Sequence, residues 1–308
     1  MATPSAHPPD WLGATFVLLG AALLAAKGVY AKLIYAEGVD YISLMAVRGA
    51  LALPLFVAWC MSRSGLTRLS GAGPGAVLAA LFAGLVCFYG GGVIDFYALT
   101  LIDANLERVI LFTYPAMVVV AIAVRRGKVP EANVLLGLAL TFLGIVLAIG
   151  GVDAQLWREN YFGAGLVLIC AVTYAAYFFA NDYAGNRIGT RAFVFIVIVS
   201  STIAIWLQFG VMHDIAEIEI TPRAWYLLLM MTVTTTVAPV VLIADGVRRI
   251  GAQRGALLST VGPPSTILLA AVFLGESLFW FQLVGMLAVL AGIYVIERRG
   301  IAPAPVGE

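Results

Sequence analysis

The chain of 308 residues is 62% hydrophobic and only 11% charged, whereas soluble domains carry about 25% charged residues. A chain as apolar as this cannot bury its hydrophobic surface in one water-soluble core, so we expect lipid to be its main solvent. Its 18 Lys and Arg nearly cancel 17 Asp and Glu, which excludes the strongly basic face of a nucleic-acid-binding protein.

Long apolar segments, separated by Gly, Pro and charged residues, follow one another along the chain. A helix needs about 20 apolar residues to cross the hydrocarbon layer, and this window predicts an all-α, polytopic membrane protein of ten transmembrane helices. The spans are expected at residues 11–35, 41–61, 75–99, 104–124, 131–150, 161–183, 191–212, 222–247, 253–274 and 278–297. Residues 1–10 lack the Lys and Arg that open a cleavable signal peptide, so we interpret them, like residues 298–308, as a cytoplasmic tail.

Basic residues indicate how the spans are oriented, because loops on the cytoplasmic side carry an excess of Lys and Arg. The loops after the second, fourth, sixth and eighth spans, together with the C-terminal tail, hold twelve of them. The opposite side holds three, Arg108, Arg158 and Arg223. This asymmetry predicts that both termini are cytoplasmic and that the protein is a multi-pass component of the cytoplasmic (inner) membrane.

An internal repeat is readable at a constant offset of 148 residues. Because each half holds five expected spans, an odd number, the second copy must cross the membrane in the opposite sense. We therefore expect two inverted five-helix repeats, residues 11–150 and 151–297, which is an architecture that places a transport site between the repeats at mid-membrane. The matching pairs are Ala104 with Ala252, Asn105 with Gln253, Pro115 with Pro263, Gly127 with Gly275, Gly137 with Gly285, and Gly144 with Gly292.

The same positions form an ordered motif in each half. The second half contains Gly251-Ala252, Pro263, Leu274-Gly275-Glu276, Gly285 and Gly292, and the first contains Tyr97-Ala98-Leu99, Ala104, Pro115, Gly137 and Gly144. This order resembles the drug/metabolite transporter superfamily and, within it, the EamA-type family. The first half departs from the pattern because Arg126-Gly127-Lys128 stands where Leu-Gly-Glu is expected. The resemblance implies a ten-helix bundle with a central cavity that carries metabolites, amino acids or drugs, often outward.

Charged residues inside the expected spans are candidates for function, because each costs at least about 2.5–3.5 kcal/mol to insert. We interpret them as two gates, one on each side of the membrane, whose charges pair when that gate is closed. The alternative is that these ions only neutralise one another and anchor helix ends at the interface. The outer cluster is Arg48, Asp95, Glu107 and Arg108, together with Lys27, and the inner cluster is Asp182, Asp245, Arg248 and Arg254.

Polar and aromatic residues near the middle of the spans predict a binding pocket. Tyrosine combines a ring with a hydroxyl group that needs a partner when buried, so a pocket with several tyrosines and one lysine suits a zwitterionic or anionic organic solute. Tyrosines packed between helices, with no solute contact, are the alternative. The expected substrate-binding residues are Lys27, Tyr89, Tyr114, Tyr174, Tyr177 and Thr235.

Other classes of protein fit the sequence less well. It lacks the His-Glu-x-x-His, Gly-x-Ser-x-Gly and phosphate-binding motifs of hydrolases and nucleotide-driven pumps, so we expect neither an enzyme nor a bound metal or cofactor. A channel usually builds its selectivity ring from several subunits. We expect a secondary transporter, a monomer or weak dimer, that exports amino acids or similar metabolites by alternating access; a multidrug or cationic-compound exporter is the alternative. Proton coupling through Asp95 and facilitated movement both fit the sequence.

Overall fold

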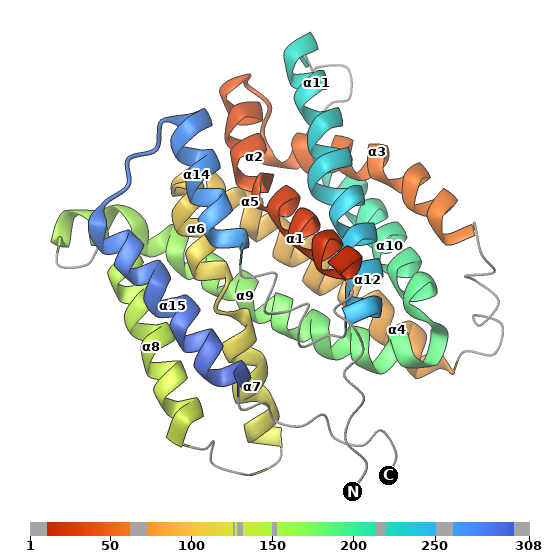
Figure 1. Cartoon of the computed structure of the whole chain (residues 1–308). Helices are drawn as coiled ribbons and strands as arrows, with labels where there is room; N and C mark the ends of the chain where they lie inside the picture. Colours follow the sequence, from red (N-terminus) through yellow and green to blue (C-terminus); the bar gives the residue numbers. More distant parts are fainter. Residues whose placement is uncertain are drawn as a thin grey trace, which may run out of the picture.

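The computed structural model describes residues 11–61, 73–125, 127, 132–149, 153–213, 220–250 and 261–298, and within them the regular structure is entirely helical (Figure 1). The first part of the chain holds α1 (Trp11–Ala25), α2 (Lys27–Ala36), α3 (Tyr41–Met61), α4 (Pro74–Phe82), the π-helical segment η2 (Ala83–Gly90), α5 (Gly91–Leu101), α6 (Ala104–Leu111), α7 (Tyr114–Arg125) and α8 (Ala132–Ile149). The rest holds α9 (Ala154–Ile188), α10 (Thr190–Met212), α11 (Pro222–Met231), the π-helical segment η4 (Thr232–Val237), α12 (Ala238–Ile250), α14 (Gly262–Leu274) and α15 (Trp280–Arg298).

The expected all-α membrane fold is confirmed. Six helices of the described chain are long and apolar enough to cross a membrane, namely Trp11–Ala36, Tyr41–Met61, Pro74–Leu101, Ala154–Ile188, Thr190–Met212 and Pro222–Ile243. Shorter apolar helices cover Leu135–Ile149, Gly262–Leu274 and Trp280–Gly292. The span expected at 104–124 is divided into α6 and α7, and α9 begins before the expected 161 because Asp153 caps its first turn by accepting from the backbone N–H groups of Gln155 and Leu156.

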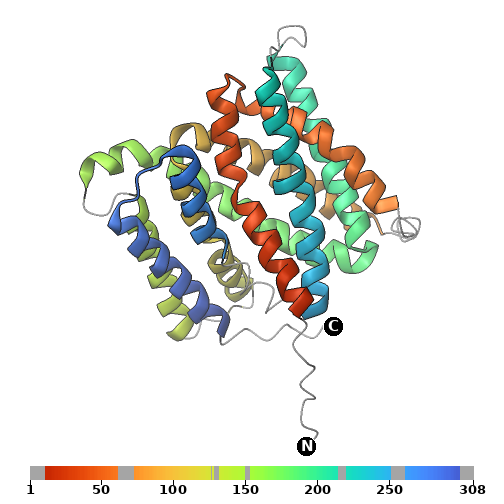
Figure 2. The ribbon, with the colours of Figure 1, turned by 45° about the horizontal axis from the view of Figure 1, so that its top comes forward.

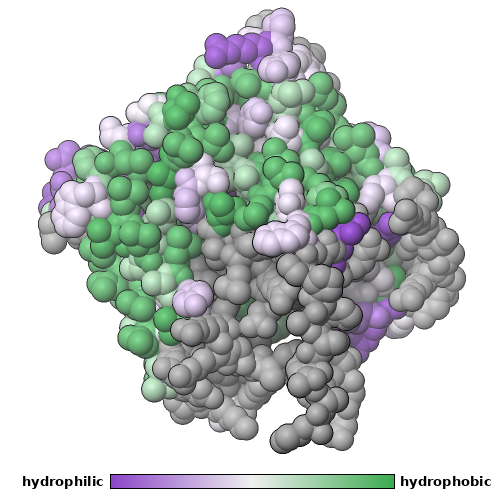
Figure 3. Space-filling model, viewed as in Figure 1, coloured by the Kyte–Doolittle hydropathy of each residue, from purple (hydrophilic) through white to green (hydrophobic). Residues whose placement is uncertain are grey.

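Large apolar side chains cover much of the outer surface (Figure 3). Phe142 is 70% exposed, Leu207 67% and Leu268 66%, and they belong to α8, α10 and α14 respectively. Water-soluble monomers rarely expose large contiguous apolar patches. Lipid is therefore the solvent for this surface, as the composition predicts.

Antiparallel helices pack closely through glycine, most clearly α8 against α15, which lie side by side in both ribbon views (Figures 1 and 2). A Cβ atom added at Gly144 would lie 2.6 Å from the carbonyl oxygen of Gly285, and one added at Gly292 would lie 2.5 Å from that of Gly137. Small residues allow this approach of two backbones within a membrane. The offset of 148 residues relates the two contacts, because it places Gly144 on Gly292 and Gly137 on Gly285. Residues that correspond in the sequence repeat thus make corresponding contacts in the structure.

Several long helices are interrupted near the middle of the molecule. The first expected span breaks at Ala26, between α1 and α2, and the fourth expected span breaks between α6 and α7. The π-helical segments η2 and η4 lie at corresponding positions of the sequence repeat, because adding the 148-residue offset to residues 84–89 gives residues 232–237. Single π-helical turns within α-helices often mark functional sites, and irregular backbone in a membrane is tolerated where it lines a cavity or is buried in protein.

Candidate functional site

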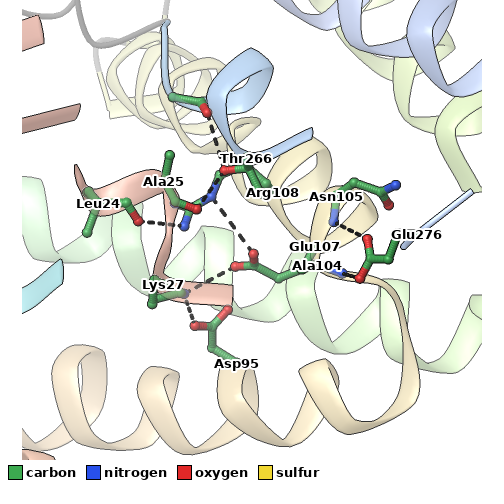
Figure 4. Close-up of polar contacts among 11 residues, drawn as sticks. Leu24, Ala25, Lys27, Asp95, Ala104, Asn105, Glu107, Arg108, Thr266 and Glu276 are labelled. Atoms are coloured by element: carbon green, nitrogen blue, oxygen red, sulfur yellow. Dashed lines mark hydrogen bonds and ion pairs between the residues drawn. The ribbon is translucent and has the colours of Figure 1, made fainter. Parts of the chain in front are cut away.

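The break at Ala26 places Lys27 at the start of α2, deep inside the protein and only 5% exposed. Its ammonium group forms an ion pair with Asp95 of α5 and a second, at 3.2 Å, with Glu107 of α6 (Figure 4). Asp95 and Glu107 are 3% and 0% exposed. The structure thus brings together a lysine and two carboxylates from three helices, in a place where an unpaired charge would be very unfavourable.

Arg108 completes this cluster and also compensates for the break in the first helix. Its Nε lies 3.9 Å from Oε2 of Glu107, and its Nη2 donates to the carbonyl oxygen of Leu24 at 3.2 Å. The hydroxyl of Thr266 on α14 donates to the next carbonyl, that of Ala25, at 2.9 Å (Figure 4). A helix break would otherwise leave these carbonyls without partners, so side chains from α6 and α14 stabilise the interrupted backbone.

A cavity of about 210 Å³ lies beside this cluster. Its wall contains the predicted binding residues Lys27, Tyr174, Tyr177 and Thr235, and the predicted gating residues Arg48 and Asp95. The remaining wall comes largely from apolar and aromatic side chains and includes residues of both π-helical segments, Cys87 and Phe88 of η2 and Thr235 and Thr236 of η4. Four of the six residues predicted to bind substrate therefore share one cavity.

The other two predicted binding residues do not line it. The hydroxyl of Tyr89 donates to Oε1 of Gln208 on α10 at 2.9 Å, and its neighbour Phe88 lines the cavity instead. The ring of Tyr114 packs against the ring of Tyr174, with 5.9 Å between their centroids. Tyr114 thus supports a cavity residue from behind, because the break after α6 ends the regular helical spacing on which its expected position was based.

The predicted inner charge cluster lies largely outside the described residues. The backbones of Asp182, Asp245 and Arg248 belong to α9 and α12, but their side chains lie outside the description, as does the whole of Arg254. The gating hypothesis stays a prediction for both the inner and the outer cluster.

Phe96 is a cavity residue that the sequence reasoning missed. The guanidinium carbon of Arg48 lies 4.6 Å from the centre of its ring, and Nζ of Lys27 lies 5.4 Å from it. An aromatic face attracts cations at such distances. In the sequence, the signal for Phe96 is its position directly after Asp95. Single aromatic residues are common in apolar spans, so this position does not distinguish it.

Glu276 is a second missed residue, although its motif was recognised. From the loop between α14 and α15, its carboxylate accepts from the backbone N–H groups of Ala104 at 2.9 Å and Asn105 at 3.3 Å (Figure 4). It therefore caps the first turn of α6, where a negative charge is favourable. Partial burial raises the pKa of this carboxyl group, and the two backbone donors oppose that rise. The contact ties the second half of the chain to the first.

A larger cavity, of about 580 Å³, lies between α7, α8 and α9. Among the described residues, its wall carries no charged side chain, and Thr113 and Thr141 are the polar residues there. Phe142 and Val172, which also line it, are 70% and 56% exposed on the apolar surface. It is therefore a groove facing lipid, and the smaller cavity with converging polar groups is the candidate site.

Comparisons with known proteins agree with this architecture. The model of the EamA-like transporter family matches residues 11–150 and 161–298. An uncharacterized transporter of Bacillus subtilis (strain 168), YcbK, is 32% identical over 294 residues, which cover 93% of each chain. An uncharacterized transporter of Archaeoglobus fulgidus is 23% identical over 64% of this chain and 68% of its own. A solved crystal structure superposes with a TM-score of 0.64 at 17% identity, covering 92% of this chain and 95% of the other, which indicates a shared fold.

Proposed function

We propose a substrate class and a mechanism from the premise that this chain belongs to the EamA-like transporter family and is a multi-pass membrane transporter. The proposed activity is export of amino acids or similar small organic metabolites across the cytoplasmic membrane, with both termini in the cytoplasm. Figure 2 shows the beginning of α1 and the end of α15 on one side of the bundle, in agreement with that orientation. Substrate would bind in the cavity beside Lys27 and Tyr174.

The observation that carries this proposal is the cavity itself. It combines charged groups, tyrosines and aromatic walls, and it is bordered by interrupted or π-helical segments that provide places for helices to bend. Its volume of about 210 Å³ is below the roughly 300–1,000 Å³ of pockets for drug-sized ligands. The size therefore favours a small metabolite over the alternative substrate class, bulky drugs.

Contacts on one side of the bundle support an alternating-access mechanism. The loop between α2 and α3 reaches the second half, where Glu37 pairs with Arg223 at 3.3 Å and accepts from the hydroxyl of Thr221 at 2.8 Å. On the same loop, Asp40 lies 3.2 Å from Nε2 of His213. Together with the Glu276 cap, these contacts join the two halves on the side assigned to the exterior. We propose that these contacts form the outer gate and separate when the cavity opens outward, whereas the Lys27 cluster, which was expected to form that gate, lies beside the cavity.

Transport by the purified full chain in proteoliposomes tests the proposal. A panel of radiolabelled amino acids and organic acids, with and without a pH gradient, should include at least one solute whose flux saturates. A dependence on the pH gradient would identify protons as the coupling ion, and its absence would identify facilitated movement. Flux indistinguishable from protein-free vesicles for every solute, or non-saturating ion currents, would contradict the carrier.

A further inference from the structure

We infer that the cavity is an anion-binding site centred on Arg48 and that it takes a small organic carboxylate with an apolar or aromatic body. The inference rests on the proposed function and narrows it, because among the small organic metabolites proposed there it selects carboxylates without an ammonium group, and it names the residue that contacts them. Arg48 thereby acquires a binding role, whereas the lysine that the sequence singled out for that role is already neutralised within the protein.

The charges of the described residues around the cavity do not balance. Lys27 is held between Asp95 and Glu107, and Glu107 also faces Arg108. These two cations and two carboxylates cancel. Arg48 is the fifth charged group of the set, and within the described chain it has neither an ion pair nor a hydrogen bond with another side chain. One positive charge is left over, and a bound monoanion would neutralise it.

Arg48 is placed to make this contact. It projects from α3 into the cavity wall, half-buried, and its guanidinium group lies against the ring of Phe96. Contact with an aromatic face leaves the N–H donors at the edge of the guanidinium plane available. Those donors match a carboxylate in a bidentate arrangement. A partner of this kind is what a partly desolvated arginine in a membrane requires.

The carboxylates of the site are poorly placed to receive a cation. Asp95 is paired with Lys27, and its other oxygen, Oδ1, is fully buried without a hydrogen-bond partner. Glu107 is completely buried behind the lysine. An ammonium group in the cavity would therefore face Arg48, while Asp95, the carboxylate in the wall, is already paired with Lys27. Like charges repel strongly at low dielectric constant, so the arrangement favours an anion over a cationic compound.

The rest of the wall suits an apolar body. Leu24, Phe88, Phe96 and Val240 contribute hydrophobic surface, and Tyr177 adds a ring. A flat ring or short aliphatic chain could lie among these side chains while its carboxylate reaches Arg48. The inferred ligand class is therefore an amphipathic monocarboxylate small enough for about 210 Å³.

Three ring compounds of similar shape test the charge directly: benzoate, its neutral relative benzamide, and the cationic benzylamine. Binding to the full-length protein in lipid nanodiscs is measured by calorimetry, and saturable flux of labelled benzoate is measured in proteoliposomes. We expect the wild type to bind benzoate at least tenfold more tightly than either other compound. Arg48→Gln should lose that preference by weakening benzoate binding tenfold or more, with benzamide binding unchanged.

Two further variants separate a binding role from a folding role. Arg48→Lys keeps the charge but loses the planar fork, so it should retain part of the preference for benzoate. Arg158→Gln removes an exposed cation on α9 and should leave the preference intact. The inference is overturned if wild-type protein binds benzoate and benzamide equally, or if folded Arg48→Gln keeps the preference. If neutral or cationic solutes show saturable flux and Arg48→Gln does not change that flux, the anion site alone is overturned. If no solute shows saturable flux, the proposed carrier is overturned.

Discussion

Removing the ammonium group of Lys27 should destabilise the protein strongly. In Lys27→Met, the carboxylates of Asp95 and Glu107 would remain buried without the cation that lies between them. Removing one partner of a buried ion pair costs about 3–5 kcal/mol, because the remaining charge is left uncompensated. Here two carboxylates lose their common partner, although Glu107 keeps a contact with Arg108, so we place the expected loss within that range.

Thermal unfolding of the purified protein in detergent measures the effect. For a chain of this size, about 1 kcal/mol corresponds to roughly 2 °C, so the apparent midpoint should fall by about 6–10 °C. Unfolding of a membrane protein is often irreversible, which makes scan rate part of the comparison. All variants are therefore heated at one rate in one detergent.

A double variant and a matched lysine make the result specific. Lys27→Met/Asp95→Asn removes the ammonium group together with one carboxylate, and it should recover at least half of the lost stability. Lys32→Met changes a half-buried lysine on the same helix that does not line the cavity, and it should shift the midpoint by less than about 2 °C. A Lys27→Met protein that melts with the wild type would refute the ion-pair reasoning.

Three further predictions concern the cap, the helix packing and the cavity. Glu276→Gln weakens the cap on α6 and should cost about 1 kcal/mol, seen as a midpoint lower by about 2 °C, whereas an unchanged midpoint would count against the cap. Gly144→Leu would push α8 away from α15 and should lower the free energy of unfolding by about 1–3 kcal/mol or more. Gly165→Leu places its side chain in open space and should leave stability unchanged in the same assay. Cys87 lines the cavity, so a bound solute should slow its alkylation several-fold, and mass spectrometry that finds no protection would place the solute elsewhere.

Much of the fold could be predicted from the sequence because lipid imposes a simple rule. Apolar segments of sufficient length must become helices, since every backbone polar group needs a partner within the membrane. The helices at Tyr41–Met61 and Thr190–Met212 agree with the expected spans to within one residue. Segments with breaks were harder to place. The interruption at Ala26, for example, is stabilised by the side chains of Arg108 and Thr266, which come from distant parts of the chain.

The candidate site could be predicted only in its composition. Charged residues are rare in an apolar chain, so Lys27, Arg48 and Asp95 were found by the cost of inserting them. The partners of these charged residues depend on how the helices pack against one another, and the spacing of residues in the sequence does not predict that packing. Tyr89 illustrates the limit, because it lies in the π-helical segment η2, where the 3.6-residue period that assigns residues to a helix face does not hold.

Counterflow is the most direct measurement of alternating access. Proteoliposomes are loaded with an excess of an unlabelled solute that shows saturable flux, diluted, and given a trace of the same solute with a label. A carrier that exposes one site to each side in turn should produce a transient accumulation of label above its equilibrium level. Label that rises monotonically to equilibrium, at a rate unaffected by the internal solute, would contradict the mechanism.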